Sequence, residues 1–428
     1  MKKKAMVGSM LAILFTISIV GCKKASISYE NKDELKGTVT VWSTGENAKL
    51  LRVAGDNFTK RNKQVKIVVS DIKNKELYEK LNANLLSSGE LPNIVSIESG
   101  RVAFLVNKFP NKFVDLTNDI SPIKDKFLKS KLDEVSINSK IMAFPWEASP
   151  SALFYRSDIF KSAGIKAEDI KTWDDYIEAG KKIDKSSNGK IKMLAFQEKK
   201  DNFFYNQLLS ELGSWYFDKE GKPIISSYNS LKAMSMVKEI YDSKIVLDYQ
   251  DESSIILAAK TGKIATLPYG TSFIATLMEN CALLKGKWAV MKLPAFEPGG
   301  KTAATLDGTT IMLIADNQNK KLTAEFVKFA VTDSDTLLTG ISKNAIFPSY
   351  IPIYEDQLFE APQDYFGGQK IWRFFSAIAK DSSYREFTKD YLQMSENMKN
   401  VELNILKGED LKKAMYDAEL NSLKTFSK

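Results

Sequence analysis

The sequence predicts an α/β fold of two lobes joined by crossing strands, and three observations support this prediction. Short apolar or alternating segments are separated by segments with helical spacing, as in a parallel sheet covered by helices. The chain has 428 residues, 44% of them apolar, which is more than one core usually organises, so two lobes are expected. Extended stretches containing proline then interrupt the alternation, as strands that cross between lobes would.

The first half of the N-terminal lobe is expected to alternate strictly between strand and helix. Residues 37–42 alternate apolar and polar side chains, and residues 92–97 form a short apolar run. Helical spacing of leucines appears between them, at Leu77, Leu81 and Leu85. We therefore expect strands at 37–42, 65–69 and 92–97, and helices at 46–61 and 74–88.

Three segments are expected to cross between the lobes. Residues 143–150 carry two prolines in an extended setting, residues 293–307 combine prolines and glycines before an apolar run, and residues 345–350 are the third. The lobes that follow from these crossings are 37–145 plus 305–345, and 146–304 plus 346–428.

Two helical regions are expected in the second lobe. Thr172 and Asp175 match a capping box, so a helix should begin there. Residues 371–426 lack strand pattern and carry apolar residues at helical spacing, and we expect them to pack as helices on this lobe.

The first 36 residues are set apart from this fold. Lysines at positions 2–4 precede an uncharged run over 5–20, the layout of an export signal. That run is short of the ~20 apolar residues that a membrane-spanning helix needs. We expect residues 1–21 to be a signal peptide and residues 22–36 to be a polar tether.

The end of the apolar run, Ile19-Val20-Gly21-Cys22, resembles the bacterial lipobox. In that motif the cysteine is acylated on sulfur and becomes the first residue after cleavage. Two acyl chains are enough for stable anchoring when each buried methylene contributes ~0.8 kcal/mol. The resemblance implies lipidation at Cys22 and a place on the extracytoplasmic face of the cell membrane. The alternative is an ordinary signal peptide with an incidental cysteine.

Composition narrows the chemistry. Without residues 1–21 the chain keeps 58 basic residues against 53 acidic ones, a balance of +5, and the charges are interspersed. We therefore expect no nucleic-acid partner.

With Cys22 acylated, Cys281 is the only remaining thiol, so no intrachain disulfide is expected. The chain has no histidine, which excludes serine–histidine–acid triads, cysteine–histidine dyads and HExxH zinc sites. We expect no metal and no cofactor.

Several segments in order resemble the extracellular sugar-binding lipoproteins of ABC importers, the group that includes maltose-binding protein. They are WEASPSALFYRSDIF at 146–160, TWDDY at 172–176, GKIATLPYG at 262–270 and GEDLKKA at 408–414. The resemblance implies a two-lobed periplasmic-binding-protein-like fold with ligand held in the interlobe cleft. It also implies a monomer, a small oligosaccharide ligand and delivery to the transmembrane subunits of an ABC permease. Tyr269-Gly270-Thr271 departs from the glycine–tryptophan pair of many relatives.

A sugar presents hydroxyls that need hydrogen-bond partners and flat C–H faces that favour aromatic surfaces. The expected ligand-binding residues are accordingly Trp42, Glu98, Trp146, Glu147, Trp215, Tyr216, Tyr269, Asp307, Trp372 and Arg373. Packing is the alternative role for each tryptophan, and a solvated or hydrogen-bonding acid is the alternative for each carboxylate. Trp173 and Trp288 are assigned to packing.

Two other functions remain open from the sequence. A surface-anchored carbohydrate-active enzyme needs only two carboxylates, and Glu147 with Glu98 or Asp307 would be the pair. A binding protein for a non-sugar solute, such as a peptide or polyamine, would instead have a strongly acidic cleft. Turnover of a glycoside separates the first of these from transport.

Overall fold

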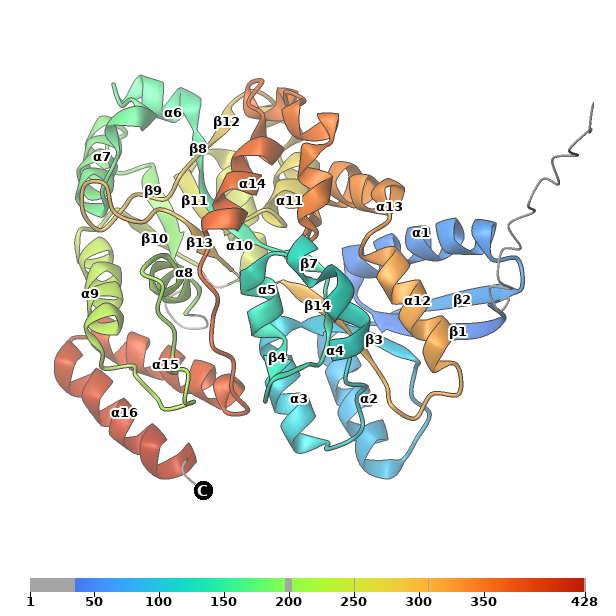
Figure 1. Ribbon diagram of the computed structural model, residues 1–428. Coiled ribbons are helices and arrows are strands. Elements are labelled where there is room, and N and C mark those ends of the chain that lie inside the picture. Colours follow the sequence, from blue (N-terminus) through green and yellow to red (C-terminus); the bar gives the residue numbers. More distant parts are fainter. Residues whose placement is uncertain (1–34, 197–201, 250, 307, 427–428) are drawn as a thin grey trace, which may run out of the picture. The chain divides into compact units, whose positions relative to one another are not determined.

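Figure 1 shows the computed structural model of the protein, which describes residues 35–196, 202–249, 251–306 and 308–426. Residues 35–428 form one compact unit. The expected signal peptide, Cys22 and Asp307 lie outside the described residues. Within the described ranges, no helix has both the length and the apolar character needed to cross a membrane.

The first sheet has five strands, and its centre is parallel. β1 pairs in parallel with β2 on one side and with β3 on the other, whereas β14 is antiparallel to both β3 and β6. The expected strands at 37–42, 65–69 and 92–97 are confirmed to within about two residues. In spatial order the strands are β2 (Val65–Asp71), β1 (Gly37–Ser43), β3 (Ile94–Glu98), β14 (Thr309–Leu313) and β6 (Phe144–Pro145).

Helices cover both faces of this sheet because its central strands are apolar on both sides. Val39 and Val41 pack with the buried side chains of α1 and α12, while Trp42 packs with those of α2 and α3. The expected helices at 46–61 and 74–88 are confirmed. The helices of this lobe are α1 (Gly45–Arg61), α2 (Asn74–Ser87), α3 (Val102–Lys108), α4 (Thr117–Ile120), α5 (Lys129–Glu134), α12 (Lys320–Ala330) and α13 (Ser334–Thr339).

The second sheet is built around β8 (Pro150–Arg156), which begins at the last residue of the first expected crossing. β8 is antiparallel to β11, β12 and β13, and β9 is parallel to both β10 and β11. The other strands are β9 (Lys192–Phe196), β10 (Val246–Asp248), β11 (Ile264–Gly270), β12 (Trp288–Met291) and β13 (Ala304–Thr305).

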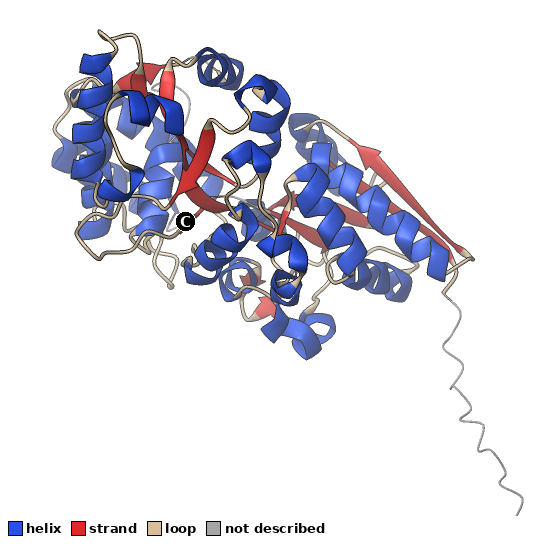
Figure 2. Ribbon diagram, turned by 90° about the horizontal axis from the view of Figure 1, so that it is seen from above, coloured by secondary structure: helices blue, strands red, loops and turns tan. Residues whose placement is uncertain are grey.

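Helices flank the second sheet as they do the first (Figure 2). The capping box is formed, because the Thr172 side chain accepts from the Asp175 backbone N–H and the Asp175 carboxylate accepts from that of Thr172. α15 and α16 pack on α9, as expected for residues 371–426. The helices are α6 (Ser157–Ser162), α7 (Trp173–Ser186), α8 (Phe203–Glu211), α9 (Tyr228–Asp242), α10 (Glu252–Thr261), α11 (Phe273–Asn280), α14 (Ile371–Asp381), α15 (Tyr391–Leu406) and α16 (Leu411–Phe426).

The chain passes between the two sheets where proline interrupts the pattern. It leaves the first sheet at β6, forms β7 (Glu147–Ala148) and enters the second sheet at β8. It returns from β13 to β14, and β15 (Phe347–Pro348) pairs antiparallel with β7. One cluster of buried apolar residues includes members from both sheets and from these crossings, such as Phe144, Trp146 and Phe347. The crossings are therefore packed as core.

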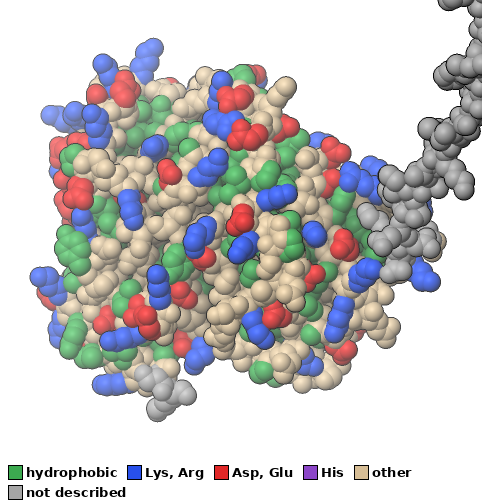
Figure 3. Space-filling model, viewed as in Figure 1, with side chains coloured by type: hydrophobic (Ala, Val, Ile, Leu, Met, Phe, Trp, Pro, Cys, Tyr) green, Lys and Arg blue, Asp and Glu red, His purple; other side chains and the backbone are tan. Residues whose placement is uncertain are grey.

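Charged side chains of both signs are interspersed on the face drawn in Figure 3. This distribution agrees with the mixed-charge surface expected from the sequence.

Candidate functional site

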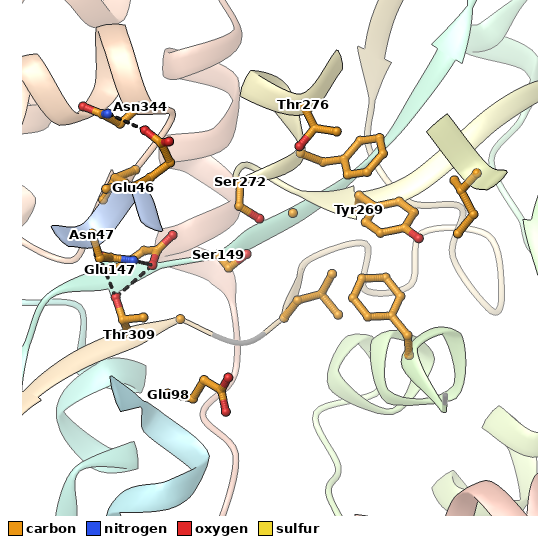
Figure 4. A pocket seen from close by; sticks show the side chains of 17 residues that line it. Glu46, Asn47, Glu98, Glu147, Ser149, Tyr269, Ser272, Thr276, Thr309 and Asn344 are labelled. Atoms are coloured by element: carbon orange, nitrogen blue, oxygen red, sulfur yellow. Dashed lines mark hydrogen bonds between the residues drawn. The ribbon is translucent and has the colours of Figure 1, made fainter. Parts of the chain in front are cut away.

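A cavity of about 550 Å³ lies where residues of the two sheets meet, and Figure 4 shows it from close by. Such a volume is within the range of small-molecule sites. The first lobe contributes Glu46 and Asn47 from the first turn of α1, and the second contributes Tyr269 from β11. The full lining is Glu46, Asn47, Glu98, Glu147, Ser149, Phe203, Ile255, Tyr269, Gly270, Ser272, Phe273, Thr276, Leu306, Gly308, Thr309, Asn344 and Ile346.

Glu147 is at the centre of a polar cluster formed by three elements. Its Oε2 accepts from Asn47 Nδ2 at 3.2 Å and lies 2.9 Å from Thr309 Oγ1. Asn47 Oδ1 in turn accepts from the indole N–H of Trp146 at 2.5 Å. These bonds orient the carboxylate, and the backbone of Thr309 contributes a further hydrogen bond to it.

Burial has a measurable consequence for this carboxylate. Desolvation raises the pKa of Glu147 above its ordinary value, and the bonds from Thr309 and Asn47 and the charge of Lys131 offset only part of the rise. Glu147 is thus the carboxylate in the cavity whose protonation begins at an unusually high pH.

Glu46 has a different environment. Burial raises its pKa, but bonds from Lys49 and Asn344 outweigh that effect, so the pKa of Glu46 falls below the ordinary value. Asn344 Nδ2 donates to Glu46 Oε2 at 2.5 Å. This bond ties the first turn of α1 to the segment that precedes β15.

Aromatic rings line the part of the cavity that belongs to the second lobe. The Tyr269 ring stacks on Phe273 with centroids 4.3 Å apart and an interplanar angle of 24°. Phe203 lies 4.8 Å from Tyr269 on the other side. Flat apolar surface therefore faces the polar cluster of Glu147 across the cavity, as Figure 4 shows.

Two glycines leave room for this arrangement. A Cβ at Gly270 would collide with Ser149 Oγ, and one at Gly308 would lie 2.6 Å from the Glu147 carbonyl oxygen. A larger residue at Gly270 would force the Ser149 hydroxyl to move, and one at Gly308 would displace the backbone of Glu147.

The family of the chain can be read from its sequence. Residues 42–336 match the family model described as bacterial extracellular solute-binding protein. The chain belongs to this family. That range includes most of both sheets and of the cavity lining, while most of β1 precedes it and Asn344 and Ile346 follow it.

Relatives of this solute-binding protein include named sugar-binding proteins. It is 26% identical to the arabinooligosaccharide-binding protein of Bacillus subtilis over 77% of this chain and 76% of that one. It is 25% identical to the lactose-binding protein of Rhizobium radiobacter, over 79% and 81% of the two chains. Among solved structures, the galacto-N-biose/lacto-N-biose I-binding protein of Bifidobacterium longum matches with a TM-score of 0.76 and 18% identity, covering 92% and 98% of the chains. This last likeness shows the same two-lobed fold.

Three of the residues expected to bind ligand line the cavity of this solute-binding protein. They are Glu98, Glu147 and Tyr269. Glu98 lies apart from the Glu147 cluster in Figure 4 and is bonded to Asn74 and Arg101. Leu306 and Gly308, the neighbours of Asp307, also line the cavity.

The remaining nominated residues do not line it, and their contact with ligand stays a prediction. Their aromatic rings are taken up by the core: Trp146 is 1% exposed and Tyr216 is fully buried, with its hydroxyl bonded to Asn202 and Asn206. Arg373 pairs with Glu360 outside the cavity. The residues outside the lining are Trp42, Trp146, Trp215, Tyr216, Trp372 and Arg373. Trp173 and Trp288 are buried, as expected.

Sequence reasoning did not identify most of the polar lining. Glu46 and Asn47 follow the carboxyl end of β1, where ligands of open α/β sheets commonly bind, so a signal for them was present. Phe273 begins α11, four residues after Tyr269 in β11. Asn344 and Thr309 had no local signal, because only the crossing of distant segments brings them to the cavity.

The described residues contain no group of three histidine, cysteine, aspartate or glutamate side chains able to hold a metal ion. Carboxylates, amides and hydroxyls beside stacked aromatic rings suit a ligand that has both hydroxyls and apolar faces.

Proposed function

We propose that this protein captures a small oligosaccharide in the cavity between its two sheets and delivers it to the permease of an ABC importer, without chemistry. The observation that carries the proposal is the pairing of the oriented Glu147 carboxylate with the stacked rings of Tyr269 and Phe273. A carboxylate accepts from sugar hydroxyls, and charge-assisted bonds of this kind are strong. The rings provide the apolar surface that the C–H faces of a sugar require.

The relatives support the sugar as ligand and transport as role. Two are named for binding arabinooligosaccharides and lactose, and the structural neighbour binds a galactose-containing disaccharide for an ABC transporter. The described lining carries three acidic side chains and no basic one, but Glu46 pairs with Lys49 and Glu98 with Arg101, which makes the site less negative than three isolated carboxylates would. A polyamine would favour a more negative site.

A carbohydrate-active enzyme is a second candidate because burial raises the pKa of Glu147, as it does for a general acid. Hydrolysis also requires a second carboxylate on the other side of the scissile bond. Glu46 and Glu98 are the candidates in the described lining, and each already bonds to protein groups. Because Glu46 and Glu98 are already hydrogen-bonded within the protein, the arrangement favours a binding role over a catalytic one.

The two sheets are proposed as the centres of lobes spanning 37–145 plus 305–345 and 146–304 plus 346–428. Closure of such lobes around ligand would be a hinge motion. The paired short strands β7 and β15 and the crossing from β13 to β14 are the natural hinges, since few backbone bonds connect the sheets elsewhere.

An extracytoplasmic place follows from the family, and we propose that a lipid on Cys22 anchors the protein there. Intact-mass measurement of protein extracted from membranes tests this proposal. A mass equal to residues 22–428 plus a diacylglyceryl group is expected, and the Cys22→Ser variant should leave the membrane. An unmodified mature cysteine in the membrane fraction would rule out the lipid anchor.

The transport role is tested by incubating residues 23–428 with arabino-oligosaccharides, lactose and galactobiose, and then measuring both bound and released sugar. We expect bound sugar to be recovered unchanged. Glu147→Gln should bind less, since an amide accepts a weaker bond than a carboxylate. Shortened products formed by the parent protein, and absent with Glu147→Gln, would establish the enzyme instead.

A further inference from the structure

A buried ion network lies beside the return crossing from β13 to β14, outside the cavity lining. Lys131 in α5 donates from Nζ to one carboxylate oxygen of Glu134, and Arg385 donates from Nε to the other oxygen at 3.0 Å. The three side chains are at most 4% exposed, and none of them lines the cavity. Replacing buried ion pairs with well-packed apolar side chains often costs no stability. The retained charges therefore point to a role beyond packing.

Lys131 connects this network to the crossing. Its Nζ donates to Ser99 Oγ at 2.9 Å, and the hydroxyl and backbone N–H of Ser99 both donate to the Gly308 carbonyl oxygen, at 3.0 and 2.9 Å. A Cβ at Gly308 would lie 3.1 Å from Lys131 Nζ and 2.6 Å from the Glu147 carbonyl oxygen. Gly308 is therefore packed between the Lys131 ammonium group and the backbone of Glu147.

The residue after Gly308 orients the Glu147 carboxylate. Thr309 Oγ1 lies 2.9 Å from Glu147 Oε2 and 3.0 Å from Asn47 Oδ1, as Figure 4 shows. The backbone of Thr309 bonds to the same carboxylate. A shift of the crossing would carry both of these Thr309 groups with it. The position of the carboxylate therefore depends on the contacts that hold Gly308.

The charges of the network also act on Glu147. Among the described side chains, the network has two cations, Lys131 and Arg385, and one anion, Glu134, which leaves one positive charge in a buried region. Burial raises the pKa of Glu147, and the charge of Lys131 is one of the effects that offset part of this rise. Lys131 therefore favours the ionised form of the carboxylate as well as its position.

We propose that Lys131 is a positioning residue for sugar binding. Its ammonium group, held by the ion network, fixes the crossing at Gly308, and the crossing fixes the Glu147 carboxylate where a ligand hydroxyl can donate to it. Lys131 does this from outside the cavity and without touching the ligand. The inference rests on the proposed function and adds a residue on which the same site depends.

Lys131→Met tests the proposal, because it removes the charge and the donor but retains most of the side-chain volume. Titration calorimetry with arabino-oligosaccharides, lactose and galactobiose should show about fivefold lower affinity at neutral pH, comparable with the loss of one hydrogen bond. The weakening of affinity on acidification should begin at a higher pH than in the parent. In a Glu147→Gln background, Lys131→Met should change the affinity much less. A role in stability alone would leave the pH profile in place and would not depend on the residue at position 147.

The pH profile reports on Glu147 because the other acids of the described lining have cationic partners of their own. Glu46 pairs with Lys49, and Glu98 pairs with Arg101. Each of these pairs is unchanged in the Lys131 variant.

Carbon NMR provides a readout that needs no ligand. In protein labelled at the glutamate carboxyl carbon, the signal of Glu147 is the one that is missing from Glu147→Gln. The titration midpoint of this signal should move to higher pH in Lys131→Met, because the cation that favours the ionised carboxylate is gone.

Ser99→Ala provides a milder variant should Lys131→Met fail to fold. It removes only the hydroxyl that joins the Lys131 ammonium group to the Gly308 carbonyl. Affinity for the same sugars should fall by about threefold, less than for the loss of the whole ammonium group.

Lys192→Met is the matched control. Lys192 is in β9, its side chain is 23% exposed, and its Nζ donates to Asp184 and to the Lys244 carbonyl oxygen. It does not line the cavity. This variant should lose stability but retain the affinity and the pH profile of the parent.

Unchanged affinity in folded Lys131→Met, or in Ser99→Ala where Lys131→Met does not fold, would overturn the positioning role and leave the proposed function standing. Equal losses of affinity from Lys131→Met in the parent and Glu147→Gln backgrounds would do the same. Failure of the parent to bind any of the three kinds of sugar would overturn the proposed function itself. The NMR midpoint would then still decide whether Lys131 controls Glu147, since an unmoved midpoint contradicts that control.

Discussion

Glu147 concentrates the chemistry of the cavity in one side chain. It is 7% exposed, and burial raises the pKa of its carboxyl above the ordinary value of 4.5. Because the pKa of Glu147 is higher in the folded state than in the unfolded state, its carboxyl group stabilises the unliganded protein most when it is protonated in both of these states. That stabilisation is lost as the pH rises through the raised pKa. The proposed binding mode requires the opposite form, because an ionised carboxylate accepts hydrogen bonds with both of its oxygens.

Ligand affinity should therefore weaken as the pH is lowered from neutrality, beginning above 4.5. Glu147→Gln should bind about tenfold more weakly at neutral pH, roughly the loss of one charge-assisted bond. The affinity of Glu147→Gln should not show this weakening as the pH is lowered. Titration calorimetry at several pH values provides the measurement. Parallel profiles for the two proteins would mean that another group controls binding.

We expect Trp146 to affect ligand binding through Asn47. Its indole N–H donates to Asn47 Oδ1, and its ring is 1% exposed. Trp146→Ala should weaken sugar binding by tenfold or more, about 1.4 kcal/mol, and should also destabilise the fold by about 3–5 kcal/mol because a large buried ring is removed.

Trp146→Phe separates these two effects. It retains most of the ring volume and removes the N–H, so affinity should fall while stability changes much less. Denaturant unfolding and calorimetry on both variants check the prediction. Full affinity in folded Trp146→Phe would show that the indole bond does not position Asn47 for ligand.

Residue identities alone indicated part of the cavity. Glu98 follows an expected strand, Glu147 lies between Pro145 and Pro150 of the first expected crossing, and Tyr269 follows Pro268. Such positions are visible in the sequence. The nominated tryptophans were chosen for their ring chemistry, but the same rings provide the largest apolar area for a core. The tryptophan rings are buried in the core, and no local sequence pattern reveals whether a ring faces the core or the cavity.

At the scale of single elements, the start of α7 depends on a reciprocal cap. Both halves of the Thr172–Asp175 capping box are formed. Thr172→Ala should lower the free energy of unfolding by about 1 kcal/mol, the usual value of an N-cap. Thr425→Ala, at an exposed position inside α16, is the control and should change it much less. Equal effects in urea unfolding would contradict the role of the cap.

α5 is joined to the segment between α14 and α15 by a buried ion network. Glu134 accepts from Lys131 and from Arg385 Nε, the latter at 3.0 Å, and all three side chains are nearly inaccessible. Burial raises the pKa of Glu134, but the charges of Arg385 and Lys131 outweigh it and lower the pKa. The stability from Glu134 is thus present above 4.5 and is lost as the pH falls through the lowered pKa.

Glu134→Gln should therefore destabilise the protein by about 3–5 kcal/mol at neutral pH, because two buried cations lose their partner. The difference from the parent should narrow as the pH falls below 4.5. Glu178→Gln, which breaks an exposed pair with Lys181, should cost less than about 1 kcal/mol. Thermal unfolding across pH tests both. A difference that stays constant with pH would contradict the linkage.

The elements of the first lobe were predictable because periodicity is local. Strands and helices between residues 37 and 98 followed from alternation and leucine spacing to within about two residues. Which strands pair with one another was harder to predict from the sequence. β14 joins β3 antiparallel from more than two hundred positions away, and only tertiary packing determines such a pairing.

At the scale of the molecule, the cavity exists because the crossings carry side chains from each sheet to the same place. Glu147 begins the short strand β7 and Ser149 follows it, while Gly308 and Thr309 lie at the return to the first sheet. Proline and glycine indicated the crossings in the sequence, and the family resemblance implied a cleft between the lobes. It did not indicate which side chains would meet there, since these come from segments distant along the chain.

The most direct test of oligosaccharide binding at this cavity is a thermal-shift screen of residues 23–428 against mono- and oligosaccharides, run in parallel with Glu147→Gln. A ligand at one hundred times its Kd stabilises the folded state by ~2.7 kcal/mol. We expect a selective rise in melting temperature with one class of oligosaccharide, and a smaller rise or none in Glu147→Gln at the same concentration. No rise with any sugar, or an equal rise in both proteins, would contradict sugar binding by the Glu147 cluster.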